Sequence, residues 1–136
     1  QDAVVQVDVR FVESQSLALK DARENAERAA ADGPERSARL RFVRGDASTY
    51  AARAKLAPDD MVILDPPRGG LSPALIEAVG KSPVRSIRYV SCDPPALFRD
   101  AVRLQEHALA VDSLALFDLF PNTHHFETVA VFSRAH

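Results

Sequence analysis

Extended and helical segments alternate along most of this chain, and this alternation restricts the fold more than any other feature of the sequence. Short runs rich in Val, Ile and Leu, typical of buried strands, are separated by segments of strong helix formers. The predicted strands are Val9–Val12, Leu40–Val43, Met61–Leu64, Ser86–Cys92, Leu109–Phe117 and Thr128–Phe132, and the predicted helices are Ser16–Gly33, Tyr50–Leu56, Ser72–Val79 and Pro94–His107. This order predicts an α/β doubly wound fold with a mostly parallel sheet, ending in an antiparallel pair at one edge.

The composition is that of an ordinary globular domain. With 136 residues, 46% of them hydrophobic and 26% charged, we expect one domain with its own core over residues 1–136. No apolar run is long enough to cross a bilayer, and no signal peptide is recognisable, so no membrane partner is expected. The single cysteine excludes an intramolecular disulfide framework and favours a cytoplasmic location. The oligomeric state is not predicted.

The charge pattern leaves the partner open. A formal net charge of −2 provides no overall basic field of the kind that attracts nucleic acid. However, 14 of the 17 basic residues are arginine, which suits bidentate phosphate contacts better than lysine does. A solvated arginine-rich surface explains the same composition equally well.

Polar residues of chemical interest follow the predicted strands. Glu13, Asp46, Asp65 and Cys92 stand at strand ends, and His124, His125 and Glu127 stand in the loop before the last strand. In open α/β sheets, ligands bind outside the carboxyl ends of the strands, so these residues should gather on one rim. An acid after an early strand suits the hydroxyls of a ribose, and Asp46 could accept from an adenine amino group. Together they indicate a nucleoside-containing cofactor, although such carboxylates are more often helix caps or turn residues.

The glycine-rich turn that opens most nucleotide-binding α/β domains is absent. None of the five glycines forms a G-x-G-x-x-G or P-loop pattern. Residues 1–13 therefore look like the second strand of such a domain, and the first strand with its glycine-rich loop is lacking.

The single thiol allows two interpretations. Cys92 ends the run YVSC and is followed by Asp93, Pro94 and Pro95. A lone cysteine is usually a small buried hydrophobic residue, whereas a thiol at a rigid strand end can act as a nucleophile. The two adjacent histidines lack a second cysteine or a close carboxylate set, so no metal site is expected.

Three motifs decide between these interpretations. The segments are DPPRGG (Asp65–Gly70), YVSCDPPALFRD (Tyr89–Asp100) and LFDLFPNTHHFETVAVF (Leu116–Phe132), preceded by VRFVESQSLALKDARENA. In this order and spacing they resemble the C-terminal catalytic domain of the RNA uracil-C5 methyltransferases, enzymes that make 5-methyluridine in tRNA and 23S rRNA. The resemblance covers nearly the whole chain. It implies a Rossmann-like class I methyltransferase fold, S-adenosyl-L-methionine as cofactor and tRNA or rRNA as partner.

The resemblance also implies roles for individual residues. Cys92 matches the family's nucleophile and Glu127 its general base, while Asp65 matches an acid near both the cofactor and the target base. Glu13 and Asp46 match the acids that hold the cofactor's ribose and adenine. Arg68 and His125 are the candidate substrate-binding residues; Arg68, like Arg99, contacts phosphate or forms a structural ion pair with Asp65, Asp93 or Asp100.

The implied chemistry explains these residue types. A thiolate that adds to C6 of uracil makes C5 nucleophilic toward the methyl group of the sulfonium. A carboxylate then removes the C5 proton, and the thiolate leaves. The target base has to leave its stack before the thiol can reach C6.

The sequence departs from the family pattern in several places. Asp93 stands where Asn is commoner, and its charge would raise the pKa of the thiol if it pointed at the sulfur. Ala96 stands where Thr is frequent. The glycine-rich loop, an upstream glutamine and the N-terminal RNA-binding barrel are missing, so we expect a fragment that is inactive alone. The alternatives are a non-catalytic RNA-binding or assembly module, and methylation of cytosine or a small molecule.

Overall fold

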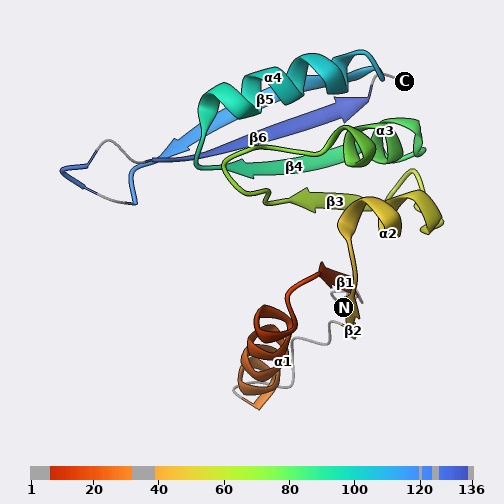
Figure 1. The fold of residues 1–136 in the computed structure, drawn as a ribbon, viewed down its shortest axis with the longest axis vertical. Coiled ribbons are helices and arrows are strands. Elements are labelled where there is room, and N and C mark those ends of the chain that lie inside the picture. Colours follow the sequence, from red (N-terminus) through yellow and green to blue (C-terminus); the bar gives the residue numbers. More distant parts are fainter. Residues whose placement is uncertain (1–6, 32–38, 120, 124–125, 135–136) are drawn as a thin grey trace, which may run out of the picture. The chain divides into compact units, whose positions relative to one another are not determined.

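The computed structural model describes residues 7–31, 39–119, 121–123 and 126–134. The chain divides into two compact units, Gln1–Tyr50 and Ala51–His136, which are treated separately below (Figure 1). Helix α2 (Ala47–Arg53) begins in the first unit and ends in the second. None of the helices in the described residues is long and apolar enough to cross a membrane.

The first unit is a single strand–helix–strand crossover. Strands β1 (Asp8–Glu13) and β2 (Arg39–Arg44) pair in parallel, with Val9 opposite Leu40 and Glu13 opposite Arg44. Two neighbouring parallel strands require a crossover, and helix α1 (Ser16–Ala31) lies between them in the chain. The rings of Phe11 and Phe42 stack with their centroids 5.2 Å apart.

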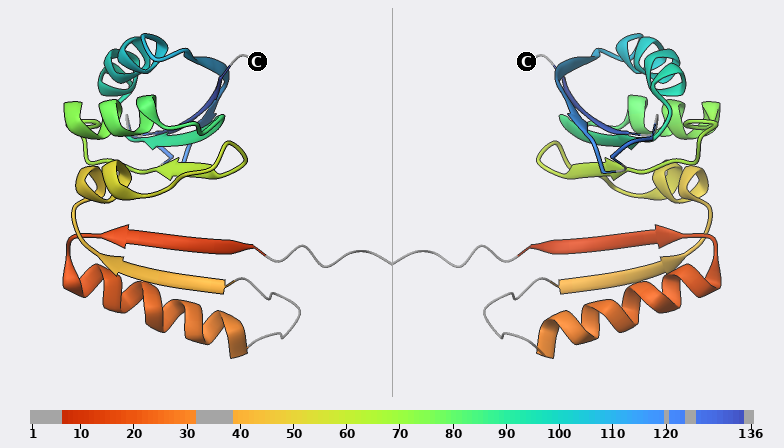
Figure 2. Two further views of the ribbon diagram at one scale, coloured as in Figure 1. Left: turned by 90° about the vertical axis from the view of Figure 1, so that its right-hand side faces the viewer. Right: turned by 90° about the vertical axis from the view of Figure 1, so that its left-hand side faces the viewer.

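The second unit contains a four-stranded mixed sheet in the order β3-β4-β6-β5. Strand β3 (Met61–Leu64) is parallel to β4 (Ser86–Ser91), whereas β6 (Glu127–Arg134) is antiparallel to both β4 and β5 (Leu109–Phe117). Helices α3 (Pro73–Lys81) and α4 (Pro94–Gln105) lie on the same side of this sheet (Figure 2).

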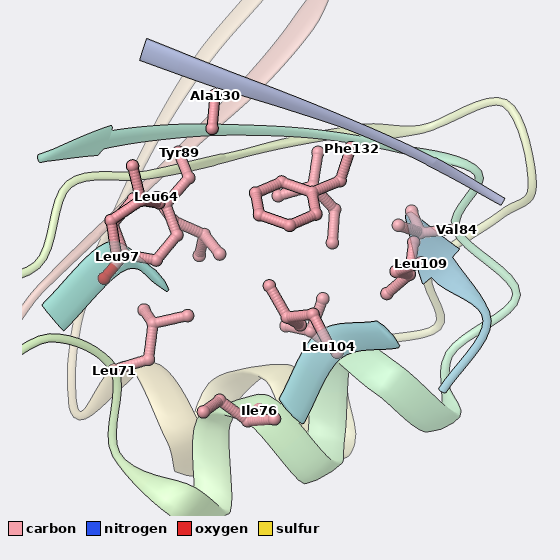
Figure 3. Close-up of a cluster of buried hydrophobic side chains, with 12 residues drawn as sticks. Leu64, Leu71, Ile76, Val84, Tyr89, Leu97, Leu104, Leu109, Ala130 and Phe132 are labelled. Atoms are coloured by element: carbon pink, nitrogen blue, oxygen red, sulfur yellow. The ribbon is translucent and has the colours of Figure 1, made fainter. Parts of the chain in front are cut away.

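The core of the second unit lies between the sheet and these two helices. Figure 3 shows Tyr89 and Phe132 of the sheet facing Ile76 and Leu104 of the helices. Side chains alternate along β4 and β6, so every second residue is buried in this layer. On the opposite face of the sheet, Met61 and Ile63 of β3 are exposed.

The predicted fold class is confirmed, with differences in detail. Within the described residues, the strands form two sheets rather than one. The antiparallel edge is present, but β6 lies inside the sheet and β5 forms the edge. The prediction of one domain over residues 1–136 stays a prediction.

Most predicted boundaries differ by one or two residues from the structure, and three differences concern predicted site residues. The helix predicted at Tyr50–Leu56 is α2, Ala47–Arg53, because the Asp46 carboxylate accepts from the Thr49 amide and starts the helix earlier. Strand β4 ends at Ser91, one residue before Cys92. Glu127, predicted in a loop, is the first residue of β6, where it pairs with Phe117.

Candidate active site

Cys92 lies in the turn between β4 and α4, and its side chain is exposed. The turn is built by its neighbours. The Ser91 hydroxyl donates to the carbonyl of Asp93 at 3.0 Å and accepts from the amide of Asp93 at 3.1 Å. Pro94 then stands at the first position of α4. The interpretation of Cys92 as a buried core residue is therefore wrong, and the thiol is accessible.

The carboxylate of Asp93 serves as the N-cap of α4. Its Oδ1 accepts a hydrogen bond from the amide of Ala96 at 3.2 Å, and its backbone is extended, as N-cap residues require. Asp93 thereby satisfies one of the helix's free N–H groups. An asparagine, the commoner residue of the family pattern, could cap the helix in the same way.

Glu127 lies at the same end of the sheet as Cys92. The last pair of the antiparallel strands β4 and β6 is Ser91 opposite Thr128, and Cys92 follows Ser91 in the chain while Glu127 precedes Thr128. Glu127 is half-buried. The predicted contacts of His124 and His125 lie outside the described residues.

Asp65 directly follows β3 at the same end of the sheet. Because Leu64 is in register with Tyr89, Asp65 is level with Val90, two residues before Cys92. Asp65 and Arg68 are both exposed, and in the described part of the chain Arg68 forms no hydrogen bond or ion pair. Arg99 instead pairs with Asp100 at 2.9 Å, the structural alternative that the sequence left open.

The three predicted catalytic residues lie at one end of the sheet. Asp65 and Cys92 directly follow the last residues of the parallel strands β3 and β4, and Glu127 is the first residue of the antiparallel β6. Asp65 and Cys92 are exposed. The second unit therefore collects an acid, a thiol and a second acid at this end of the sheet.

The two remaining predicted acids lie in the first unit. Glu13 ends β1 and accepts from the amide of Gln15 at 2.7 Å. Asp46 follows β2 and accepts from the amide of Thr49 at 2.8 Å and from its hydroxyl at 2.9 Å. Backbone hydrogen bonds, from Gln15 and Thr49 respectively, are the main cause that holds the pKa of each carboxyl below its usual value. Both acids are thus turn or cap residues and ionised acceptors at the carboxyl ends of adjacent strands.

Metal ligation and cavities add no further site residue. No group of three or more His, Cys, Asp or Glu side chains within the described ranges could hold a metal ion. A hollow of about 530 Å³ between α2 and α3 has five alanines among its eleven lining residues and includes none of the predicted site residues.

The sequence analysis did not predict that Asp100 is buried. Asp100 is fully buried and accepts a hydrogen bond from the Tyr89 hydroxyl at 2.8 Å. The available signal was helical spacing, because Ala96, Leu97, Asp100 and Leu104 fall on one face of α4. A charged residue on an otherwise apolar helix face indicates a buried polar contact.

Comparison with known proteins agrees with the motifs. The family model described as tRNA (Uracil-5-)-methyltransferase matches residues 53–135. The chain belongs to this family. It is 37% identical over 124 residues to an uncharacterized RNA methyltransferase of Streptomyces avermitilis, covering 91% of this chain and 27% of that protein. It is 44% identical over 100 residues to the 23S rRNA (uracil(1939)-C(5))-methyltransferase RlmD of Chromohalobacter salexigens, covering 73% and 21%.

A solved structure extends the family assignment to the fold. The tRNA (uracil-54, C5)-methyltransferase of Pyrococcus abyssi, in complex with S-adenosyl-L-homocysteine, superposes with a TM-score of 0.74 at 30% identity. The match covers 92% of this chain and 28% of that one. The fold is therefore that of a Rossmann-like class I methyltransferase. The chain spans between about a fifth and about a quarter of the length of these relatives.

Proposed function

We propose that this chain forms part of an enzyme that methylates C5 of uridine in tRNA or rRNA. The observation that carries the proposal is the placement of an accessible thiol, Cys92, and a carboxylate, Glu127, next to the last pair of β4 and β6, Ser91 and Thr128. Covalent pyrimidine methylation needs this combination, a nucleophile for C6 and a base for the C5 proton.

Glu13 and Asp46 fit S-adenosyl-L-methionine as the cofactor. Both are ionised acceptors at the carboxyl ends of adjacent parallel strands, where such folds bind nucleotides. Glu13 would accept from the ribose hydroxyls, and Asp46 from the adenine amino group. When bound, the cofactor supplies an electrophilic methyl group on a sulfonium.

Two residues of the second unit would carry out separate steps of the reaction. The Cys92 thiolate adds to C6 of the flipped uracil, and the electron pair of the C5–C6 double bond moves into an enolate. C5 forms its bond to the methyl carbon, while the sulfonium sulfur keeps the electrons of the broken bond. Glu127 then takes the C5 proton, the C5–C6 double bond re-forms and the Cys92 thiolate departs.

Two further roles belong to the loop after β3 and to the segment before β6. Asp65 would lie near the cofactor and the target base. The exposed Arg68 would contact an RNA phosphate, because a guanidinium binds phosphate through two N–H groups. His125 stays a predicted substrate contact. RNA is the proposed partner. The proposed location is the cytoplasm, as expected for an enzyme that modifies RNA.

A methyl-transfer assay on two substrates tests the proposal. The chain, alone and joined behind the upstream part of a relative, is supplied with S-adenosyl-L-methionine and with uracil-containing or cytosine-containing RNA. We expect methylation of the uracil RNA by the joined form only, and its loss in Cys92→Ala. Transfer that persists in Cys92→Ala would exclude the covalent role of this thiol. RNA binding with no transfer in any form would favour the binding-module alternative.

A further inference from the structure

A buried carboxylate joins three segments of the second unit. Asp100 of α4 is 0% exposed. Its Oδ2 accepts from the backbone amide of Leu71 at 2.7 Å and from the Tyr89 hydroxyl at 2.8 Å. Its Oδ1 accepts from the Arg99 guanidinium, from Nε at 3.1 Å and from Nη2 at 2.9 Å. A buried carboxylate is costly unless it is paired and hydrogen-bonded, and here four donors surround it.

The same guanidinium also holds the loop that follows β3. Arg99 Nη2 donates to the carbonyl of Gly69 at 2.7 Å. The amide of Gly70 donates to the carbonyl of Pro67 at 2.8 Å, which closes the loop on itself. The loop that begins at Asp65 is thus tied to α4 at two successive points, the Gly69 carbonyl and the Leu71 amide.

Gly70 allows this close approach for two reasons. Its φ of +80° lies in the left-handed region that favours glycine. A Cβ at this position would lie 2.4 Å from Arg99 Nη2 and 2.4 Å from Asp100 Oδ2. Any side chain here would therefore push the loop away from the carboxylate.

The joined segments are those that carry the proposed site. The loop contains Asp65 and Arg68, while Cys92 stands between Tyr89 of β4 and Asp100 of α4. Tyr89 and Asp100 are fully buried, so neither can touch RNA or cofactor. Stability alone does not require this arrangement, because replacing a buried charge and its partners by apolar side chains of similar volume is often neutral or stabilising.

We propose that Asp100, with Tyr89 and Arg99, is a positioning residue for the reaction. By this network it fixes the loop of Asp65 and Arg68 relative to the turn of Cys92. The inference rests on the proposed function for its catalytic consequence, but the holding of the loop is a property of the fold. A displacement of about 1 Å in such a site lowers rates on the order of 10²-fold.

Two variants and a matched control test the network. Tyr89→Phe removes one hydrogen-bond donor to Asp100. Asp100→Asn keeps the side-chain size but removes the negative charge to which Arg99 and Leu71 donate hydrogen bonds. Arg134→Lys is the control. It perturbs hydrogen bonds to Gly80, Ser82, Val84 and His107, none of which belongs to the loop. All are compared in the form of the protein that transfers methyl groups in the assay above.

Hydrogen exchange and kinetics are the two readouts. In Asp100→Asn we expect exchange of the Leu71 amide to rise about tenfold or more. We expect kcat to fall on the order of 10²-fold with little change in KM for RNA, and a smaller loss in Tyr89→Phe. Arg134→Lys should leave hydrogen exchange of the Leu71 amide and kcat unchanged, even if it lowers thermal stability as much as Asp100→Asn does.

The two readouts separate the two hypotheses. If Asp100→Asn lowers kcat no more than a control of equal stability, the residue only stabilises the core and the positioning role is wrong. Unchanged Leu71 exchange in Asp100→Asn would equally overturn the inference. If the unaltered protein transfers no methyl group to any uracil RNA, the proposed function fails. Leu71 exchange then decides alone whether Asp100 holds the loop.

Discussion

Cys92 follows Ser91 in the chain and Glu127 precedes Thr128, and Ser91 and Thr128 form the last pair of the antiparallel strands β4 and β6. This pair therefore anchors the segments of the proposed nucleophile and the proposed base at the same end of the sheet. Hydrogen bonds along both strands hold such an anchor more firmly than two loops would.

This relationship predicts that Glu127→Gln uncouples the two halves of the reaction. Cys92 can still add to C6, and C5 can still be methylated, but no carboxylate removes the C5 proton. We expect turnover to fall by about 10²–10⁴-fold and a covalent protein–RNA adduct to accumulate with ordinary uridine. A denaturing gel detects the adduct. Glu77→Gln, an exposed glutamate on α3, serves as the control. Absence of the adduct together with normal turnover would remove Glu127 from the mechanism.

Asp93 should contribute to stability through helix capping. Asp93→Asn keeps an acceptor oxygen for the Ala96 amide, whereas Asp93→Ala leaves that amide unsatisfied. We expect Asp93→Ala to lower the free energy of unfolding by about 1 kcal/mol, within a range of about 0.5–2, and Asp93→Asn to change it little. Urea unfolding followed by circular dichroism measures both. Equal losses in the two variants would show that the charge, not the cap, matters.

Tyr89 should make the fold sensitive to alkali. Burial, followed by the hydrogen bond and negative charge of Asp100, raises the pKa of Tyr89 well above its usual value. The unfolded phenol ionises near pH 10, so the stabilisation by Tyr89 is fully present below about pH 10 and is lost as the pH rises further. We expect a loss of about 1.4 kcal/mol per pH unit above pH 10 that Tyr89→Phe lacks. Parallel slopes in the two proteins would contradict the prediction.

Arg134 should stabilise the end of the second unit that lies away from the site. Its guanidinium donates to the carbonyls of Gly80 at 2.8 Å and of Ser82 and Val84 at 3.2 Å, and to that of His107. We expect Arg134→Ala to lower the free energy of unfolding by about 2–3 kcal/mol. Arg134→Lys should recover only part of this, because an ammonium lacks the planar fork. Chemical unfolding of the variants checks both values.

Local patterns were sufficient to predict most elements and part of the site. The boundaries of β3 and β5 were predicted correctly because each apolar run is bounded by turn residues. Asp65 and Cys92 could be placed at strand ends because Pro66 and Pro94 stop the preceding strands.

Features that depend on pairing between distant segments could not be predicted from local sequence patterns. The sequence places Glu127 in a loop because its strand partner, Phe117, is distant in the sequence and leaves no local signal. The position of β6 between β4 and β5 likewise depends on pairing between strands that are distant in the sequence. The role of Asp100 depends on the Leu71 amide, 29 residues away, which no helical pattern reveals.

Covalent methylation of uracil by Cys92 is tested most sharply with RNA that contains 5-fluorouridine, together with S-adenosyl-L-methionine. Fluorine at C5 cannot leave as a proton does, so a methylated adduct should stay bound to Cys92 on a denaturing gel. We expect a shifted protein–RNA band from the chain joined to the upstream part of a relative, and no band in Cys92→Ala. Methylation of ordinary uridine RNA with no band from the fluorinated RNA would contradict the covalent mechanism.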